Sequence, residues 1–355
     1  MNTLSATPLR FRAGVAVLAS VMAAALVAVP AVAAHADEGD VTWTVRTASN
    51  DLGPDRTSFR YTLEPGTEVE DAMVVSNHGD TALDLGVYAA DGFTTESGQF
   101  DLIVGGAESK NIGVWVQADS DRITIDPGAT VEVPFIVSIP ENATPGDYAG
   151  GIVTSLAETG GTETIDVDRR LGIRIGVRVG GDLAPSLAVE NVHVDWNGGL
   201  NPFAGGDATV GYTLHNTGNT TLSAEQHATL TGPFGWFPST VGAIADPPQL
   251  LPGESWTVSV PVRDVPATFL LSASVGVVPV VVEASGSTTS LERVEVGASG
   301  AAVPWMLLVL IVLVAALVVA VIRLRAVLTA RRQAREDARV QEAIDLALAE
   351  RAPAV

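Results

Sequence analysis

The feature that most constrains this chain is an apolar run near its C-terminus. Residues 303–322 read VPWMLLVLIVLVAALVVAVI and contain no charged residue. A helix with a rise of about 1.5 Å per residue covers about 30 Å over such a run, which matches the hydrocarbon core of a bilayer. Trp305 stands at one edge, and five arginines follow the other: Arg323, Arg325, Arg331, Arg332 and Arg335. The run therefore predicts one transmembrane helix at 303–322, in preference to a buried core helix, and the positive-inside bias places residues 323–355 in the cytoplasm.

The N-terminus has the parts of a secretory signal. Arg10 and Arg12 precede an apolar stretch, and the small-residue triplet Ala34-His35-Ala36 follows it. We expect a signal peptide at residues 1–36 with cleavage after Ala36, while an uncleaved first span stays open. Either way the following segment is exported. The chain is therefore expected in the plasma membrane as a single-pass type I protein, with its ectodomain extracellular on the cell-wall side.

The exported segment is strongly acidic. The whole chain carries −21 at pH 7, of which residues 1–36 and 323–355 each contribute +2, so residues 37–302 carry −25. Such a field repels nucleic acids and anionic polymers, and no nucleic-acid partner is expected. The chain contains no cysteine, which excludes disulfides, thiol catalysis and cysteine metal sites. Stability must therefore come from the burial of apolar surface.

Strand-like patterns fill the exported segment. The clearest is residues 171–179, where isoleucine and valine alternate with Arg174, Gly176 and Arg178. A period of two places the aliphatic side chains on one sheet face and both guanidinium groups on the other. Residues 131–139, 208–214 and 256–262 show similar runs. Gly, Pro, Asn and Asp separate these runs every eight to twelve residues or so, which is typical of an all-β sandwich.

Two kinds of turn repeat between the halves of this segment. One kind of turn follows a strand-like run: Asn77-His78-Gly79-Asp80-Thr81 and Asn216-Thr217-Gly218-Asn219-Thr220. The other kind precedes a strand-like run: Pro127-Gly128 and Pro252-Gly253. In the Asn-x-Gly turns we expect asparagine to cap the backbone and glycine to supply a positive φ. The repeat predicts an all-β fold of two tandem immunoglobulin-like β-sandwiches.

The domain limits follow from composition. Residues 180–185, GGDLAP, combine flexible glycines with a proline and mark a boundary. We place the first sandwich at 37–181 and the second at 183–297. Residues 297–302, GASGAA, are expected to form a short flexible stalk. Residues 323–355 are expected to form a basic, helical cytoplasmic tail that continues the membrane helix.

A longer motif in the first sandwich carries a family resemblance. It consists of Tyr88, Gly92, Gly98, Trp115, Ile123-Thr124-Ile125-Asp126-Pro127-Gly128, Val133-Pro134-Phe135-Ile136-Val137, Ile139-Pro140, Pro145-Gly146-Asp147-Tyr148-Ala149-Gly150-Gly151-Ile152 and Arg174-Ile175-Gly176-Val177-Arg178-Val179. With the order of signal, two sandwiches, span and basic tail, this motif resembles the WxL-interacting proteins of Gram-positive bacteria. The resemblance implies that the first sandwich binds peptidoglycan and that the second binds a partner or host protein, such as a WxL-domain or other surface protein. For residues 183–297 the resemblance rests on position and β pattern. The tripeptide Trp305-Met306-Leu307 fits the WxL pattern only by chance, because it lies inside the membrane span.

Five residues of this motif are candidates for binding: Trp115, Asp147, Tyr148, Arg174 and Arg178. Two glycines after Tyr148 allow close backbone approach. The turn is therefore either a tight sandwich corner, with Tyr148 packed in it, or part of a saccharide or peptide groove. Trp115 is suited to the core as well as to a ligand platform. Arg174 and Arg178 are suited to pair with the carboxylates of a peptide stem.

No catalytic or metal-binding pattern stands out. The four histidines after residue 36 are scattered, with no His-Glu-x-x-His pattern, and there is no Gly-x-Ser-x-Gly, Ser-x-x-Lys or phosphate-cradling glycine loop. Asp119-x-Asp121 and Asp166-x-Asp168 are better explained as solvated turns than as calcium ligands. We therefore expect no enzyme activity, no cofactor and no metal.

These observations predict a membrane-anchored, non-enzymatic surface scaffold that binds peptidoglycan and recruits a surface or secreted protein. The alternative is a protein-binding adhesin or surface-assembly factor without wall affinity, whose exposed strand edges capture a partner strand. An enzyme acting on wall polymers is a third alternative, although the carboxylate pairs that so many acidic residues supply by chance do not indicate a site.

Overall fold

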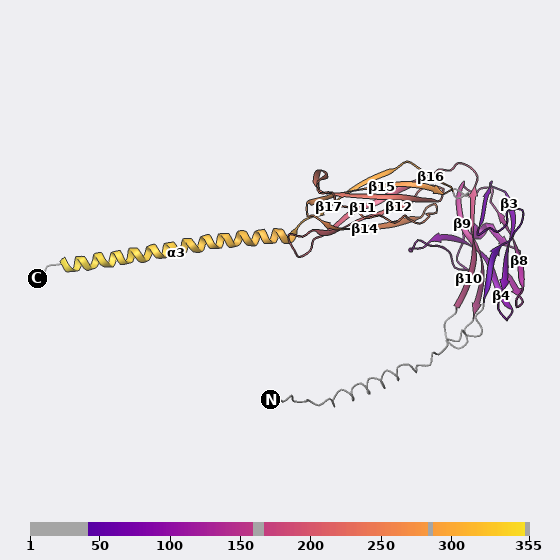
Figure 1. Ribbon diagram of the computed structural model, residues 1–355, viewed down its shortest axis with the longest axis horizontal. Helices are drawn as coiled ribbons and strands as arrows, with labels where there is room; N and C mark the ends of the chain where they lie inside the picture. The colour runs from indigo at the N-terminus through magenta and orange to yellow at the C-terminus, as the bar shows by residue number, and fades with distance from the viewer. Residues whose placement is uncertain (1–41, 159–166, 283–286, 352–355) are drawn as a thin grey trace, which may run out of the picture.

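The computed structural model describes residues 42–158, 167–282 and 287–351. It is mostly β-structure followed by one long apolar helix, α3 (Trp305–Arg351), as Figure 1 shows. This part of the expected fold class is confirmed. The expected signal peptide, residues 1–36, lies outside the described residues.

The first half contains two facing sheets. One has the order β1 (Trp43–Thr47), β3 (Glu68–Asn77), β8 (Thr130–Ser138), β6 (Val116–Ala118). The other has the order β2 (Phe59–Leu63), β10 (Val167–Val179), β9 (Gly146–Glu158), β4 (Leu83–Thr94), β5 (Phe100–Leu102), and β7 (Arg122–Ile125) also pairs with β4. A short helix, α2 (Ile112–Trp115), lies between β5 and β6 in the chain. Side chains of both sheets, among them Phe59, Phe135 and Ile175, form one buried core.

The second half repeats this layout with fewer strands. One sheet has the order β11 (Leu187–Asn197), β12 (Gly206–Asn216), β14 (Ser255–Val265). The other has β15 (Phe269–Val282) between β13 (Leu222–Thr231) and β17 (Val294–Ala302), and β16 (Thr288–Ser290) also pairs with β15. A 3-10 turn, η1 (Pro233–Gly235), follows β13. The core of this second sandwich is separate from the first and centres on Tyr212, Leu214 and Leu230.

The alternation read from the sequence is confirmed where it was clearest. Residues 171–179 lie in β10, with Ile173, Ile175 and Val177 buried and Arg174 and Arg178 on the opposite face. The runs at 208–214 and 256–262 lie in β12 and β14, and the run at 131–139 lies in β8 except for Ile139. Hydrophobic side chains on a period of two therefore define the inner face of each sheet.

The repeated asparagine turns are built alike in the two sandwiches. The buried side chains of Asn77 and Asn216 donate to the carbonyls of Thr81 (2.7 Å) and Thr220 (2.8 Å), and each accepts from the backbone N–H two residues later. The expected positive φ is wrong for Gly79 and Gly218 and belongs instead to the Pro-Gly turns, at Gly128 (φ 69°) and Gly253 (φ 82°). The asparagine side chain holds each turn by itself, so the glycine needs no left-handed backbone.

The expected flexible stalk is not observed. Residues 297–302 belong to β17, which pairs antiparallel with β15 from Val294 to Ala302. A side chain at Gly300 would collide with Val194 of β11, so small residues are required here for packing. The second sandwich therefore continues to Ala302, and only Val303 and Pro304 separate it from α3.

Within the described residues, α3 is the helix that is long and apolar enough to cross a membrane. It runs without interruption from Trp305 through the apolar run and the following arginines to Arg351. The helix thus extends beyond residue 322, while a basic cytoplasmic tail remains a prediction. The side of the membrane on which it lies remains a prediction.

A buried polar cluster joins β2 and β3. The Asp71 carboxylate, whose side chain is inaccessible, accepts hydrogen bonds from Arg56 (2.6 and 2.9 Å), Tyr61 (2.7 Å) and Asn50 (2.7 Å). Burial, followed by the hydrogen bond to Asp71, raises the pKa of Tyr61. Buried charges are tolerated in proteins when they are paired and hydrogen-bonded, as this cluster is.

Candidate functional site: a groove between the two sandwiches

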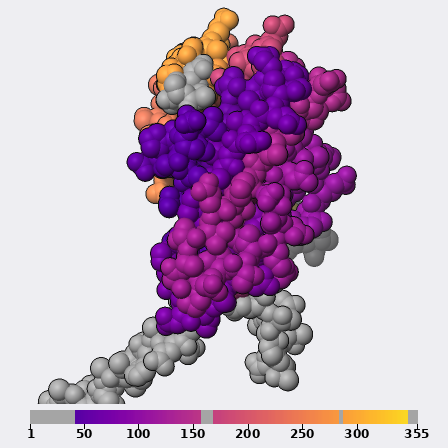
Figure 2. Space-filling view, turned by 90° about the vertical axis from the view of Figure 1, so that its right-hand side faces the viewer, coloured from indigo at the N-terminus to yellow at the C-terminus, as the bar shows by residue number. Residues whose placement is uncertain are grey.

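The two sandwiches meet at one end of each and form a bent, L-shaped arrangement (Figure 1). Seen from the side of the first sandwich, the second lies behind one end of it (Figure 2). The junction includes the start of β9, the end of β10 and the tip of the β4–β5 hairpin.

Asp147 connects the two sandwiches. Its carboxylate pairs with Arg178 of β10, with Nε at 2.6 Å from Oδ1 and an Nη atom at 2.9 Å from Oδ2. It also accepts a hydrogen bond from the backbone N–H of Thr221 in the second sandwich (2.8 Å). The side chains of Asp147 and Arg178 are only 12% and 13% exposed. Asp147 is therefore held from both sides of the junction.

Asn219 supports the same contact from the second sandwich. Its carbonyl accepts from the N–H of Asp147 (2.8 Å), and its side-chain amide donates to the carbonyls of Pro145 (2.9 Å) and Asp182 (3.0 Å). Gly146 has φ 146° and lies so close to Asn219 that a side chain would collide with it. The repeated Asn-x-Gly turn of the second sandwich thus doubles as a docking point for the first.

A second set of contacts fixes the hairpin tip. The carboxylate of Glu254 accepts from the N–H and the hydroxyl of Thr94 (both 2.7 Å) and from the N–H of Leu251 (2.9 Å). Gly98 in the hairpin turn packs against Pro248 and Trp256. Two separate contact points resist rotation better than one, so the angle between the sandwiches is well defined.

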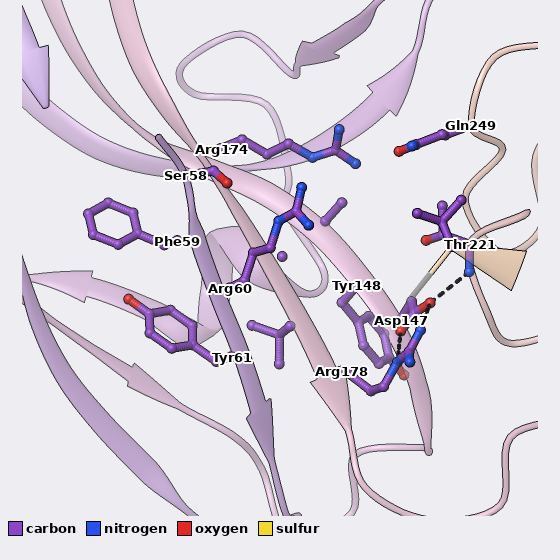
Figure 3. Close-up of a pocket in the computed structure, with 14 residues that line it drawn as sticks. Ser58, Phe59, Arg60, Tyr61, Asp147, Tyr148, Arg174, Arg178, Thr221 and Gln249 are labelled. Atoms are coloured by element: carbon purple, nitrogen blue, oxygen red, sulfur yellow. Dashed lines mark hydrogen bonds and ion pairs between the residues drawn. The ribbon is translucent and has the colours of Figure 1, made fainter. Parts of the chain in front are cut away.

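A groove of about 90 Å³ lies in the corner between these contacts, and we call it the junction groove. Its floor is the outward face of β2, β10 and β9, and Thr221, Gln249 and Val282 of the second sandwich form its other side. In Figure 3, Arg60 of β2 and Arg174 of β10 extend from neighbouring strands to the same side of the sheet, with Gln249 opposite.

Arg60 and Arg174 concentrate positive charge in the groove. Burial and then the nearby charge of Arg60 lower the pKa of Arg174, while Glu254 opposes this effect. The Arg174 guanidinium lies 4.2 Å from the ring centroid of Phe100, within the range of a cation–π contact. Among the described residues no oxygen accepts a hydrogen bond from Arg174. Its donors are therefore available to an anionic group in the groove.

The structure brings four of the five expected binding residues to the groove or its wall. Asp147, Tyr148, Arg174 and Arg178 all line it. Asp147 and Arg178 bind each other, and the Tyr148 hydroxyl bonds Thr144 (2.6 Å). Trp115 instead lies in the core, 7% exposed, with its ring 4.6 Å from that of Tyr148. Arg174 is the member of this set best placed to meet a ligand, and the binding role of all five remains a prediction.

Sequence reasoning missed Arg60 and the second-sandwich residues Thr221 and Gln249. Phe59 and Tyr61 are buried and Arg60 is exposed, so alternation in β2 alone would have placed Arg60 on an outward face. No local sequence pattern predicts that β2 pairs in parallel with β10, with Arg60 opposite Gly176. This pairing makes Arg60 and Arg174 diagonal neighbours on one face.

The groove has the chemistry of a binding site. Within residues 42–158, 167–282 and 287–351, no group of three or more His, Asp or Glu side chains is arranged to hold a metal ion. A guanidinium group recognises a carboxylate through two parallel hydrogen bonds. The groove therefore suits recognition of an anionic group.

Comparisons with known proteins leave the family open. No family model and no curated protein matches the chain. Similar solved structures include the CFA/I fimbrial chaperone–tip adhesin complex (9% identity, TM-score 0.35, 74% of this chain and 99% of that one) and the CupB2 chaperone of Pseudomonas aeruginosa (13%, 0.30, 67% and 97%). A family 123 glycoside hydrolase from Clostridium perfringens matches at 14% identity and a TM-score of 0.28, over 39% of this chain and 27% of the hydrolase. These similarities assign no activity or ligand to this chain.

Proposed function

We propose that this protein is a membrane-anchored cell-surface adaptor that captures a carboxylate-bearing segment of a protein partner in the junction groove. This is the assembly-factor alternative drawn from the sequence, now given a site. Residues 303–322 would cross the membrane, the two sandwiches would face the exterior, and the arginine-rich part of α3 would lie in the cytoplasm. The first helix turn follows the second sandwich directly, which would hold one end of this sandwich at the membrane and the groove at its other end (Figure 1).

The observation that carries the proposal is the convergence of Arg60 and Arg174. The segment that contains them has a net charge of −25, so a pair of neighbouring guanidinium groups there opposes the general field. Burial and, to a smaller extent, the charge of Arg60 lower the pKa of Arg174. An incoming carboxylate would accept hydrogen bonds from the Arg174 guanidinium, and a hydrogen bond to a charged group contributes about 1.5–3 kcal/mol.

Groove size and strand order favour an extended peptide. Cofactor and drug-sized ligands usually occupy about 300–1,000 Å³, whereas the groove offers about 90 Å³. That is room for a side chain or a chain terminus. Strand β2 is the last strand of its sheet and, in the described part of the chain, pairs only with β10. Its outer edge could therefore pair with an extended partner segment whose carboxylate reaches the arginines.

Peptidoglycan is the second source of the same chemistry. Its stem peptides carry carboxylates, and the resemblance to WxL-interacting proteins implies wall binding by the first sandwich. In that case the groove would hold a stem peptide, and a WxL-domain or other surface protein would bind elsewhere. We favour the protein partner because the groove includes residues of both sandwiches, whereas the resemblance assigns wall binding to the first alone.

Charge reversal in the groove tests the proposal. A photo-crosslinking residue at Gln249, introduced into the full-length protein in cells that naturally make it, reports what occupies the groove. We expect a crosslinked adduct whose yield falls at least about tenfold in Arg174→Glu, since about 1.4 kcal/mol corresponds to a tenfold change in affinity. Protease sensitivity of the attached mass identifies a protein, and muramidase sensitivity identifies wall.

Arg122→Glu is the matched control. Arg122 lies on β7 of the same sandwich, is 67% exposed and pairs with Asp84, away from the groove. It should leave the crosslink unchanged. Adduct yields that are equal in Arg174→Glu and the unmodified protein would contradict the proposed site, and a wall adduct without a protein adduct would replace the protein partner by peptidoglycan.

A further inference from the structure

The end of the second sandwich that faces α3 differs from the rest of the molecule. Strand pairing sets Thr231 opposite Ser272, Gly206 opposite Val265 and Phe269 opposite Ala302, where β17 ends. The loops at residues 198–205, 232–240 and 266–268 therefore lie at the same end as Ala302. Figure 1 shows this end beside the start of α3. We call these three loops, with the adjoining Phe269, the basal loops.

The basal loops expose large apolar side chains. Phe234 is 91% exposed, Leu200 85% and Phe203 80%. Further exposed aromatic side chains are Trp236, Phe237 and Phe269. The exposed large apolar residues described in the first sandwich reach at most 63%, at Val114, and include one aromatic, Phe93, at 38%. Soluble surfaces rarely gather so many large apolar groups unless they mark a contact.

Three of these aromatic residues adopt an unfavourable backbone conformation. Phe234, Phe237 and Phe269 have φ values of 57°, 53° and 67°. In the described part of the chain they are the only aromatic residues with positive φ. A left-handed backbone costs an L-residue about 1–2 kcal/mol. A strained backbone that also exposes its side chain is consistent with a role outside the sandwich core.

The basal loops also lack charge. Residues 198–206, 232–245 and 265–282 contain no Asp, Glu, Lys or Arg, although residues 37–302 carry −25. Inserting a charged side chain below the membrane surface costs free energy, whereas Trp and Phe are favoured in the interfacial layer. The exposed residues Asp207 and Asp264 flank these segments, so acidic side chains reach the edge of the basal loops but are absent from the loops themselves.

Chain length ties the basal loops to that helix. Only Val303 and Pro304 link β17 to α3, and two to three residues extend at most about 10 Å. A cavity of about 230 Å³ separates the first turn of α3, at Trp305 and Met306, from Pro202 and Ala267 of the basal loops. The loops are thus within reach of any surface from which α3 emerges.

We propose that the basal loops are a membrane-docking surface, inserted into the interfacial layer of the bilayer that α3 crosses. The inference rests on the proposed membrane anchoring. Continuity with α3 selects lipid as the occupant, because a protein covering these loops would have to displace the bilayer next to the helix. Docking at three loops fixes the inclination of the second sandwich, and through the junction contacts it also fixes the direction in which the groove opens.

The lack of cysteine makes a direct test possible. Single-cysteine variants of the full-length protein, labelled with the environment-sensitive dye NBD, are placed in phosphatidylcholine–phosphatidylglycerol nanodiscs with or without doxyl-labelled lipid. Phe203→Cys and Phe234→Cys report on the basal loops. Leu317→Cys, inside the apolar run, reports on the anchor, and Val114→Cys, 63% exposed in the first sandwich, reports on a surface far from lipid.

We expect doxyl lipid to quench NBD at positions 203 and 234 several-fold more than at position 114. Quenching at positions 203 and 234 should be strongest when the doxyl group is attached near the lipid headgroup. Quenching at 317 but not at 203 or 234 would overturn the docking surface and leave the anchor intact. No quenching at 317 would overturn the anchor itself. A second pair, Leu200→Cys and Thr240→Cys, checks that the result does not depend on removing an aromatic ring.

Discussion

Replacing Asp71 with alanine is expected to lower the free energy of unfolding of the first sandwich by about 3–5 kcal/mol. The substitution would leave the Arg56 guanidinium, 15% exposed, without its counter-charge and the Tyr61 hydroxyl without its acceptor. Urea unfolding of the detergent-solubilised full-length protein measures the loss. Hydrogen exchange of peptides from β3 follows the first sandwich, and peptides from β12 serve as an internal reference.

Asp84→Ala is the matched control for that loss. Asp84 pairs with Arg122 at 2.7 Å, but the two side chains are 52% and 67% exposed. Exposed pairs contribute about 0–1 kcal/mol. A comparable loss in both variants would show that Asp71 has no special structural role.

The same carboxylate gives the stability a defined pH dependence. Burial alone would raise the pKa of Asp71, but hydrogen bonds from Arg56, Tyr61, Ala72 and Asn50 hold it below its usual value. The folded pKa then lies below the unfolded one, about 3.9. The stabilisation is complete above the unfolded pKa and is lost as the pH falls through the folded pKa. Asp71→Asn should therefore lose less stability between pH 5 and pH 2, roughly the span of this titration, than the unmodified protein does.

Asp147→Ala is expected to loosen the junction between the sandwiches while both remain folded. It removes the partner of Arg178 and the acceptor of the Thr221 N–H, and breaking a mostly buried pair costs on the order of 3 kcal/mol. Spin labels at Val114→Cys and Thr289→Cys report the distance between the sandwiches. The distance distribution should be narrow in the otherwise unmodified chain and several-fold broader with Asp147→Ala.

Glu295→Ala provides the comparison for the junction. Glu295 pairs with Arg293 on the surface of the second sandwich, where the two side chains are 60% and 53% exposed. Its removal should leave the distance distribution unchanged. An equally narrow distribution in Asp147→Ala would mean that Glu254 and Asn219 fix the junction without Asp147.

Local patterns predicted the strands and turns well because their causes are local. Alternation alone located β10, and the spacing of Asn77 and Asn216 from their glycines located two turns with matching hydrogen bonds. The stalk prediction failed because composition was read without context. Small residues also suit a strand that must approach another closely, as Gly300 approaches Val194.

The groove was only partly predictable. Arg174 followed from alternation, but its neighbour Arg60 lies more than a hundred residues away and joins it through the parallel pairing of β2 with β10. Asp147 was expected to be a binding residue, and this stays a prediction, while its contact with Thr221 depends on how the two sandwiches meet. Tertiary pairings of this kind leave no periodic trace in a single sequence.

The direct link from β17 to α3 has a mechanical consequence. A pulling force between the groove and α3 would act along the axes of β15 and β17. These two strands are antiparallel and pair over nine residue pairs, from Val294 to Ala302 of β17. Interstrand bonds lie perpendicular to the strands, so such a force shears the whole ladder at once. The joint would resist pulling far better than a glycine-rich tether, and a captured partner could be held against flow.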